Sequence, residues 1–149
     1  GIGPNRSPRV CDDGTMALDR PSVDEAYDQV IARRDTLSAP ALVDELRTLL
    51  GSRLVAYLAG VSSTRVITDY VVGSTPVPHN ADTRLQLAYT IAGLQNRLGA
   101  TPRLIQAWFQ GQNPRLNDCA PARVIFESAG SSDLDIPTFL SAAAALVSE

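Results

Sequence analysis

Residues 97–126 constrain the fold of this chain more than any other stretch, because they read as two helices joined by a turn too short to be a loose linker. Thr101 and Pro102 are typical of a helix start, since threonine caps the first turn and proline loses nothing at the first helical position. Gly111 and an Asn-Pro dipeptide then predict a helix end and a tight turn. A second helix is expected from about Pro121. The only tryptophan of the chain, Trp108, lies in this unit and predicts an αα corner with an aromatic anchor.

Apolar side chains at helical spacing predict the buried faces of this corner. They are Leu104, Ile105, Trp108 and Phe109 in the first helix and Val124 and Ile125 in the second. An aromatic residue among aliphatic ones is usually part of a core, so the exposed turn between the helices is the better place for function.

Residues 21–79 are expected to form an N-terminal helical domain. Ser22 and Glu25 have the spacing of a capping box, in which the serine accepts from the backbone and the glutamate reaches back. Pro40 separates this first helix from a second one, which Gly51 ends. Both helices are amphipathic and show no residues of chemical interest.

Residues 52–73 predict a helix-turn-helix. The two helices of this motif cross closely, which requires a small residue in the first helix, a glycine near the turn and apolar residues on the second. Ala56, Gly60 and Val66 meet these requirements. The start of the second helix is where this motif contacts bases and phosphates. The polar residues expected to face out there are Ser62, Ser63, Thr64, Arg65 and Thr68.

A plain structural hairpin is the alternative for the same residues. Asp69 carries a carboxylate that would repel phosphate, and Arg65 is the only cation on the expected recognition helix. Further along, residues 74–82 read as a turn-rich linker and residues 83–98 as a long helix. Asp135 is expected to cap a last helix, whose alanine-rich sequence favours helix strongly.

The turn after Trp108 carries a family resemblance. The residues Trp108, Gly111, Asn113, Pro114, Leu116 and Pro121 stand in the order W-x-x-G-x-N-P-x-L, followed by a proline-led helix. This order resembles the C-terminal toxin-binding domain of the Xre/MbcA/ParS-like antitoxins, in which it follows an Xre-type helix-turn-helix. The resemblance covers residues 40–149. Asp69 departs from it, because the family usually has a hydrophobic or aromatic residue there.

The resemblance implies an all-α fold, with an Xre-like helix-turn-helix bundle followed by a small helical toxin-binding domain in residues 80–149. It implies a homodimer that represses its own operon by binding operator DNA and that occludes a cognate toxin of the NAD-consuming RES type. The six motif residues would form the partner-binding region. Arg115, next to them on the exposed turn, has the position and chemistry to pair with a carboxylate of the partner.

Composition limits the other classes of function. The chain has 149 residues, a net charge of −3 and a pI of about 5.1, which argues against a surface generally designed for nucleic acid. No apolar run approaches the length of a membrane span, and no export signal is visible, so a cytoplasmic protein without a membrane partner is expected. Residues 1–20 read as a disordered tail or an appended leader, with Met16 a possible natural start.

Enzymatic chemistry finds little support in the sequence. There is no glycine-rich phosphate loop after a strand. His79 is the only histidine, and Cys11 and Cys119 are best read as two free thiols, so no metal constellation forms. We expect no catalytic residue, no metal and no cofactor. Two non-enzymatic alternatives to the antitoxin stay open: a stand-alone DNA-binding regulator with a C-terminal dimerisation domain, and an adaptor that binds a protein but no DNA.

Overall fold

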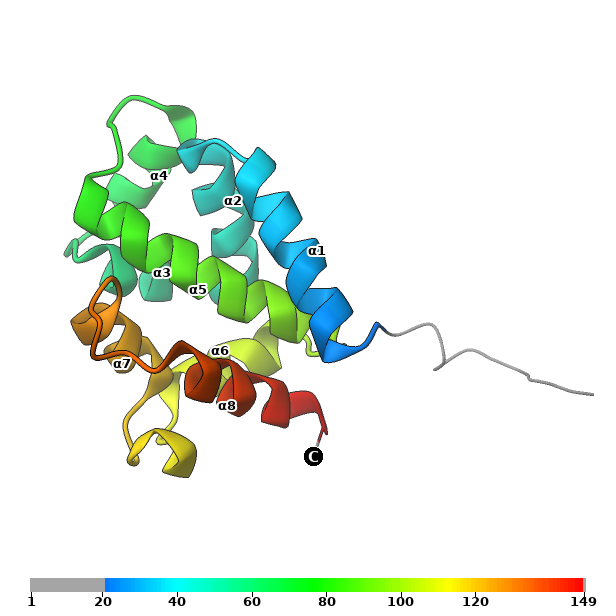
Figure 1. The fold of residues 1–149 in the computed structure, drawn as a ribbon. Helices are drawn as coiled ribbons and strands as arrows, with labels where there is room; N and C mark the ends of the chain where they lie inside the picture. The colour runs from blue at the N-terminus through cyan, green and yellow to red at the C-terminus, as the bar shows by residue number, and fades with distance from the viewer. Residues whose placement is uncertain (1–20, 149) are drawn as a thin grey trace, which may run out of the picture.

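The computed structural model describes residues 21–148, and this part of the chain is all-α, as predicted, with eight α-helices and no strand (Figure 1). The helices are α1 (Val23–Thr36), α2 (Ala39–Leu50), α3 (Ser52–Ala59), α4 (Thr64–Val72), α5 (His79–Arg97), α6 (Pro102–Gln110), α7 (Pro121–Ser128) and α8 (Ile136–Ser148), with a 3-10 turn η3 (Pro114–Leu116). No helix in this range is both long and apolar enough to cross a membrane. The expected tail, with Cys11 and Met16, lies outside the described residues.

Helix α5 is the element around which the others pack. It contacts α1, α2 and α3 as well as α6, α7 and α8, and Figure 1 shows it crossing the middle of the molecule. Every residue from 88 to 95 is buried, which a helix achieves only when other helices surround it. Gly93 lets α1 approach closely, because a Cβ at this position would lie 3.0 Å from Val30 Cγ1.

The apolar core is continuous across the two predicted domains. Leu46 of α2, Ile67 of α4, Ile91 of α5 and Ile125 of α7 are each fully buried and belong to one cluster. The predicted boundary between residues 79 and 80 falls at the first residues of α5. The two predicted domains therefore share helix α5 and are not separated by a linker.

Local caps fix most helix starts where they were predicted. The Ser22 side chain accepts from the backbone N–H of Glu25 at 3.2 Å, and the Glu25 carboxylate accepts from the N–H of Ser22 at 3.0 Å. These two hydrogen bonds form the predicted capping box, and they hold the pKa of Glu25 below its ordinary value. Thr101 caps α6, and Asp135 accepts from the backbone N–H of Thr138 in the first turn of α8.

Helix α5 begins earlier in the structure than the sequence predicted. The sequence predicted a linker over residues 74–82, but the helix already begins at His79, directly after Pro78 in an extended conformation. The early turn is held by Ala81, which is 1% exposed and packs in the core. The sequence shows no apolar periodicity here, because the residues around Ala81 are polar: His79, Asn80 and Asp82.

A polar network joins three helices next to this core. Arg33 of α1 forms an ion pair with Glu45 of α2, and the hydroxyl of Tyr89 of α5 donates to the other carboxylate oxygen of Glu45 at 2.8 Å. The hydrogen bond from Arg33 holds the pKa of Glu45 below its ordinary value. Burial, and then the hydrogen bond to Glu45, raise the pKa of Tyr89 to about 12.

Replacing Glu45 by glutamine is expected to lower the free energy of unfolding by about 1 kcal/mol at neutral pH. The folded pKa of Glu45 lies below its unfolded value, so its stabilisation is present above the unfolded pKa, about 4.3, and is lost as the pH falls through the folded pKa. The stabilities of the parent and of Glu45→Gln should therefore converge in acid. Urea denaturation from neutral pH to about pH 3 measures this, and a difference that stays constant with pH would contradict it.

Candidate functional site

The segment from α3 to α4 forms two short helices joined by a tight turn. Gly60 ends α3 in the left-handed conformation, with φ 79° and ψ 27°, and the N–H of Val61 returns to the carbonyl of Ala56 at 3.0 Å. α4 begins at Thr64, and the side chain of Ser63 accepts from the N–H of Arg65 at 3.1 Å. Ala56 is 5% exposed, so the small residue lies inside, where a close crossing of α3 needs it.

Burial divides α4 into an inner and an outer face. Ile67 and Tyr70 are buried against the bundle. The residues predicted to contact DNA are all exposed and lie at the start of α4 and in the turn before it: Ser62, Ser63, Thr64, Arg65 and Thr68. Asp69 is half-buried, and its backbone carbonyl accepts from the N–H groups of Gly73 and Ser74 at the end of the helix.

Two residues that the sequence reading missed lie beside this outer face. Arg53 and Tyr57 of α3 line a shallow groove together with Ser62, Ser63 and Thr64. Both are exposed, Tyr57 at 44%. Their separation of four positions places them on one side of α3. The sequence contained a signal for this face, because an aromatic residue that faces away from the core of an otherwise apolar helix indicates a contact or a function outside the core.

Arg84 of α5 ties the end of α3 to α7. Its Nε donates to the carbonyl of Leu58 at 2.5 Å, and its Nη2 donates to the carbonyl of Ala59 at 3.0 Å, so a cation satisfies the last carbonyls of the helix. The same guanidinium lies 4.8 Å from the ring centroid of Phe126 on α7. Phe126 in turn packs against Tyr57, with ring centroids 5.2 Å apart.

The predicted turn after α6 is present and rests on Asn113. The side-chain oxygen of Asn113 accepts from the backbone N–H of Arg115 at 2.9 Å, and the backbone N–H of Asn113 donates to the carbonyl of Cys119 at 3.2 Å. Asn117 and Asp118 adopt positive φ, at 58° and 61°, which asparagine and aspartate tolerate better than other side chains. Asn113 is 9% exposed, and its side-chain oxygen serves to hold the turn together.

Trp108 joins α6 to α8. Its ring packs edge-on against Phe109, with centroids 5.3 Å apart, and stacks on Phe139 of α8 at 6.1 Å. Phe109 and Phe139 are both buried, while Trp108 is half-buried. The aromatic anchor predicted for the corner therefore also fixes the last helix. Leu104, expected on the same inner face, is 44% exposed, because the buried arc of α6 is centred on Ile105 and Phe109.

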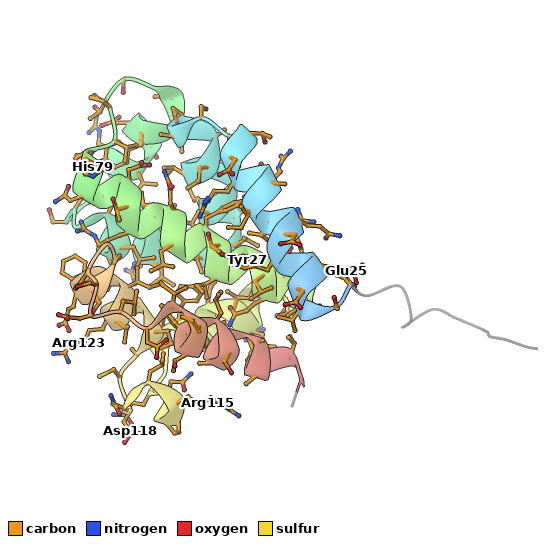
Figure 2. All side chains as sticks on the ribbon, in the orientation of Figure 1. Glu25, Tyr27, His79, Arg115, Asp118 and Arg123 are labelled. Atoms are coloured by element: carbon orange, nitrogen blue, oxygen red, sulfur yellow. The ribbon has the colours of Figure 1, made fainter. Side chains whose placement is uncertain are left out.

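The partner-binding residues predicted from the resemblance divide into inner and outer ones. Pro121 and Asn113 are buried, and Trp108, Gly111 and Leu116 are half-buried. Pro114 and Arg115 are exposed, and Figure 2 shows Arg115 and Asp118 projecting at the tip of the η3 turn.

Grooves flank α8 on two sides and meet at Arg115. One, of about 330 Å³, runs between α8 and the turn, and is lined by Trp108, Asn113, Pro114 and Arg115. The other, of about 660 Å³, lies between α8 and α1 and is lined by Tyr27, Leu140 and again Arg115. The exposed part of the turn is therefore continuous with the surface of the last helix.

The residues considered for chemistry are dispersed. His79 is exposed in the first turn of α5, on the far side of the molecule from Arg115 (Figure 2). Cys119 is half-buried in the loop before α7 and forms no disulfide with a described residue. Between residues 21 and 148, no three histidine, cysteine or carboxylate side chains come together in a way that would hold a metal ion.

Comparisons with protein-family models, with curated proteins and with solved structures found no match to this chain. The resemblance to the Xre/MbcA/ParS-like antitoxins therefore stays a prediction that rests on the residues of the Trp108 motif and of the α3–α4 segment.

Proposed function

We propose that this chain is an antitoxin with two binding surfaces. The outer face of the α3–α4 segment binds operator DNA as a helix-turn-helix, and the η3 turn with α8 covers a toxin of the NAD-consuming RES type. The observation that carries the proposal is that the two surfaces lie on different sides of one bundle, so that neither blocks the other (Figure 1). The chain acts in this proposal as a homodimer without a cofactor.

The DNA half of the proposal is supported by burial and by exposed donors. α4 packs through Ile67 and Tyr70 and leaves hydroxyl groups and Arg65 outside. Neither Arg53 nor Arg65 forms an ion pair with another described residue, so both guanidinium groups are available to phosphate. A dimer doubles these contacts, which matters for a protein with a net charge of −3.

The partner half is supported by the build of the turn. Asn113 and Trp108 hold it from inside, so that Pro114 and Arg115 are presented on a rigid support next to α8. A preorganised turn loses little conformational entropy on binding. Arginine is suited to the rim of such an interface, because its planar guanidinium pairs with carboxylates in a fixed geometry.

A protein adaptor without DNA binding is the second candidate. It is favoured by the composition of α4, in which Arg65 is the only cation and Asp69 follows four positions later. In this reading the η3 turn and α8 have the same role, and the exposed face of α4 has none.

The test is co-expression of the untagged chain with the protein encoded next to it, which carries an affinity tag. We expect a stoichiometric complex, and growth arrest by the neighbour alone that the chain relieves. Arg115→Glu should weaken the complex about tenfold or more, because a carboxylate at this position would repel the partner carboxylate with which Arg115 is proposed to pair. Arg65→Glu is the matched control, since Arg65 is exposed on α4, which belongs to the other proposed surface.

The outcomes separate the candidates. A complex that protects growth but shows no salt-dependent DNA binding would favour the adaptor. If no complex forms and the neighbour does not arrest growth, the antitoxin proposal is wrong, and specific DNA binding would then identify a stand-alone regulator.

A further inference from the structure

We infer that the proposed DNA surface extends beyond the helix-turn-helix onto α7, where Arg123 contacts the phosphate backbone, with Arg53 and Tyr57 of α3 as the link. This inference rests on the DNA half of the proposed function and adds contacts that a reading of residues 52–73 does not contain. The structural basis is a continuous row of exposed side chains that crosses from α3 to α7.

The row is built from contacts and helical spacing. Arg53 and Tyr57 lie four positions apart on α3 and line the groove that the start of α4 closes. The Tyr57 ring packs on Phe126 at 5.2 Å, and Arg123 precedes Phe126 by three positions on the same side of α7. Figure 1 shows α7 next to the α3–α4 turn, and Figure 2 shows Arg123 extending outward from the molecule.

The link between the helices is rigid. Arg84 holds the carbonyls at the end of α3 and lies over Phe126, so Phe126 cannot turn without loss of this contact. The positions of Arg123 and of the α3–α4 turn are thus fixed relative to each other. Contacts made from a rigid support lose less entropy when a phosphate binds.

The chemistry of the row fits a polyanion. Arg53 and Tyr57 line one groove with Ser62, Ser63 and Thr64, and Arg123 lies one helical turn before Phe126, on which the Tyr57 ring packs. Arginine, tyrosine, serine and threonine are all donors to phosphate oxygens. Arg65, which follows Thr64 in the first turn of α4 and is exposed, adds a third cation. A net acidic protein needs such a local concentration of positive charge in order to bind DNA at all.

Glu127 is the internal competitor for Arg123. The two side chains form an ion pair of 2.9 Å that is exposed on both sides, 64% for Arg123 and 55% for Glu127. Exposed pairs of this kind hold their partners weakly, so a phosphate can replace the carboxylate. The inference therefore predicts opposite effects for the two members of the pair.

The experiment measures binding of the full chain to a fluorescent duplex that carries the region upstream of its own coding sequence, between about 50 and 200 mM salt. Arg123→Ala is expected to weaken binding and to lower the slope of log affinity against log salt by about 1, the value for one lost phosphate contact. Glu127→Gln is expected to strengthen binding at low salt. Arg97→Ala, on the far end of α5, should change neither the affinity nor the slope.

The outcomes distinguish this inference from the function on which it rests. Salt-dependent binding that Arg65→Ala weakens, with an unchanged slope for Arg123→Ala, would overturn the inference and leave the proposed DNA binding in place. If the unaltered chain binds the duplex no better than Arg65→Ala at any salt concentration, the DNA half of the proposed function is wrong and the inference falls with it.

Discussion

Replacing Phe139 by alanine is expected to lower the free energy of unfolding by about 3–5 kcal/mol, the cost of removing a large side chain from a close-packed site. Phe139 is 1% exposed and stacks on Trp108, while the buried positions beside it on α8 are the small residues Ala142 and Ala143. No other large side chain of α8 is fully buried among the described residues. Alanines bury little apolar area, so Phe139 is the largest apolar side chain that α8 buries completely, and the half-buried Leu140, Leu146 and Val147 add smaller contacts.

The measurement is urea denaturation followed by tryptophan fluorescence. Trp108 is the only tryptophan of the chain and lies in contact with Phe139, so its emission reports directly on this site. We expect a lower midpoint and, before unfolding, an emission shifted to longer wavelength as water reaches the indole. Leu104→Ala is the matched control, because Leu104 is 44% exposed on α6 and its loss should cost about 0.5 kcal/mol or less. A Phe139→Ala protein with parental stability and emission would show that α8 is held by other contacts.

Replacing Gly60 by alanine is expected to cost about 2–4 kcal/mol, from two separate causes. The first is backbone strain, because Gly60 has φ 79° and a left-handed conformation costs other residues about 1–2 kcal/mol. The second is a clash, because a Cβ at Gly60 would lie 2.9 Å from Nη2 of Arg84. Nη2 of Arg84 can move away, but only by giving up its hydrogen bond to the carbonyl of Ala59.

Gly73 provides the control that separates the two causes. It ends α4 with φ 82°, and nothing lies within 4 Å of the position its Cβ would take. Gly73→Ala should therefore show the strain alone, and the difference between the two variants measures the clash. In an Arg84→Ala background the cost of Gly60→Ala should fall to that of Gly73→Ala. Equal costs of Gly60→Ala and Gly73→Ala in the parent protein would mean that Arg84 contributes nothing to the end of α3.

Most helix ends could be predicted from the sequence, because the signals that set them act within one turn. Ser22, Thr101 and Asp135 each accept from a backbone N–H of the helix that they start, as their positions indicated. Gly60 ends α3 because only glycine adopts its conformation without strain. The start of α5 escaped prediction, since it depends on the burial of Ala81 and on no local cap.

The positions of candidate site residues could be predicted from the sequence only where local helical spacing decides which side chains are exposed. The exposed face of α4 follows from helical spacing, which fixes where Ile67 and Tyr70 point once they are buried. The role of Asn113 could not be predicted from the sequence. Its hydrogen bonds within the turn make this motif residue an internal support of the structure. The exposure of residues such as Leu104 also could not be predicted without the packing of the whole bundle. Helical spacing gives the direction of a buried face but not its width.

The sequence by itself determined the helical class of the described residues and the ends of most helices, because hydrogen-bonded caps, glycine conformations and apolar periods are local properties. The tertiary structure alone decided that α3 and α7 lie together. Arg84 reaches carbonyls 25 and 26 residues before it and the ring of Phe126 on a third helix, and no local signal encodes contacts at such separations. They form because the surrounding helices bury one shared core around α5 and bring these side chains to the same place.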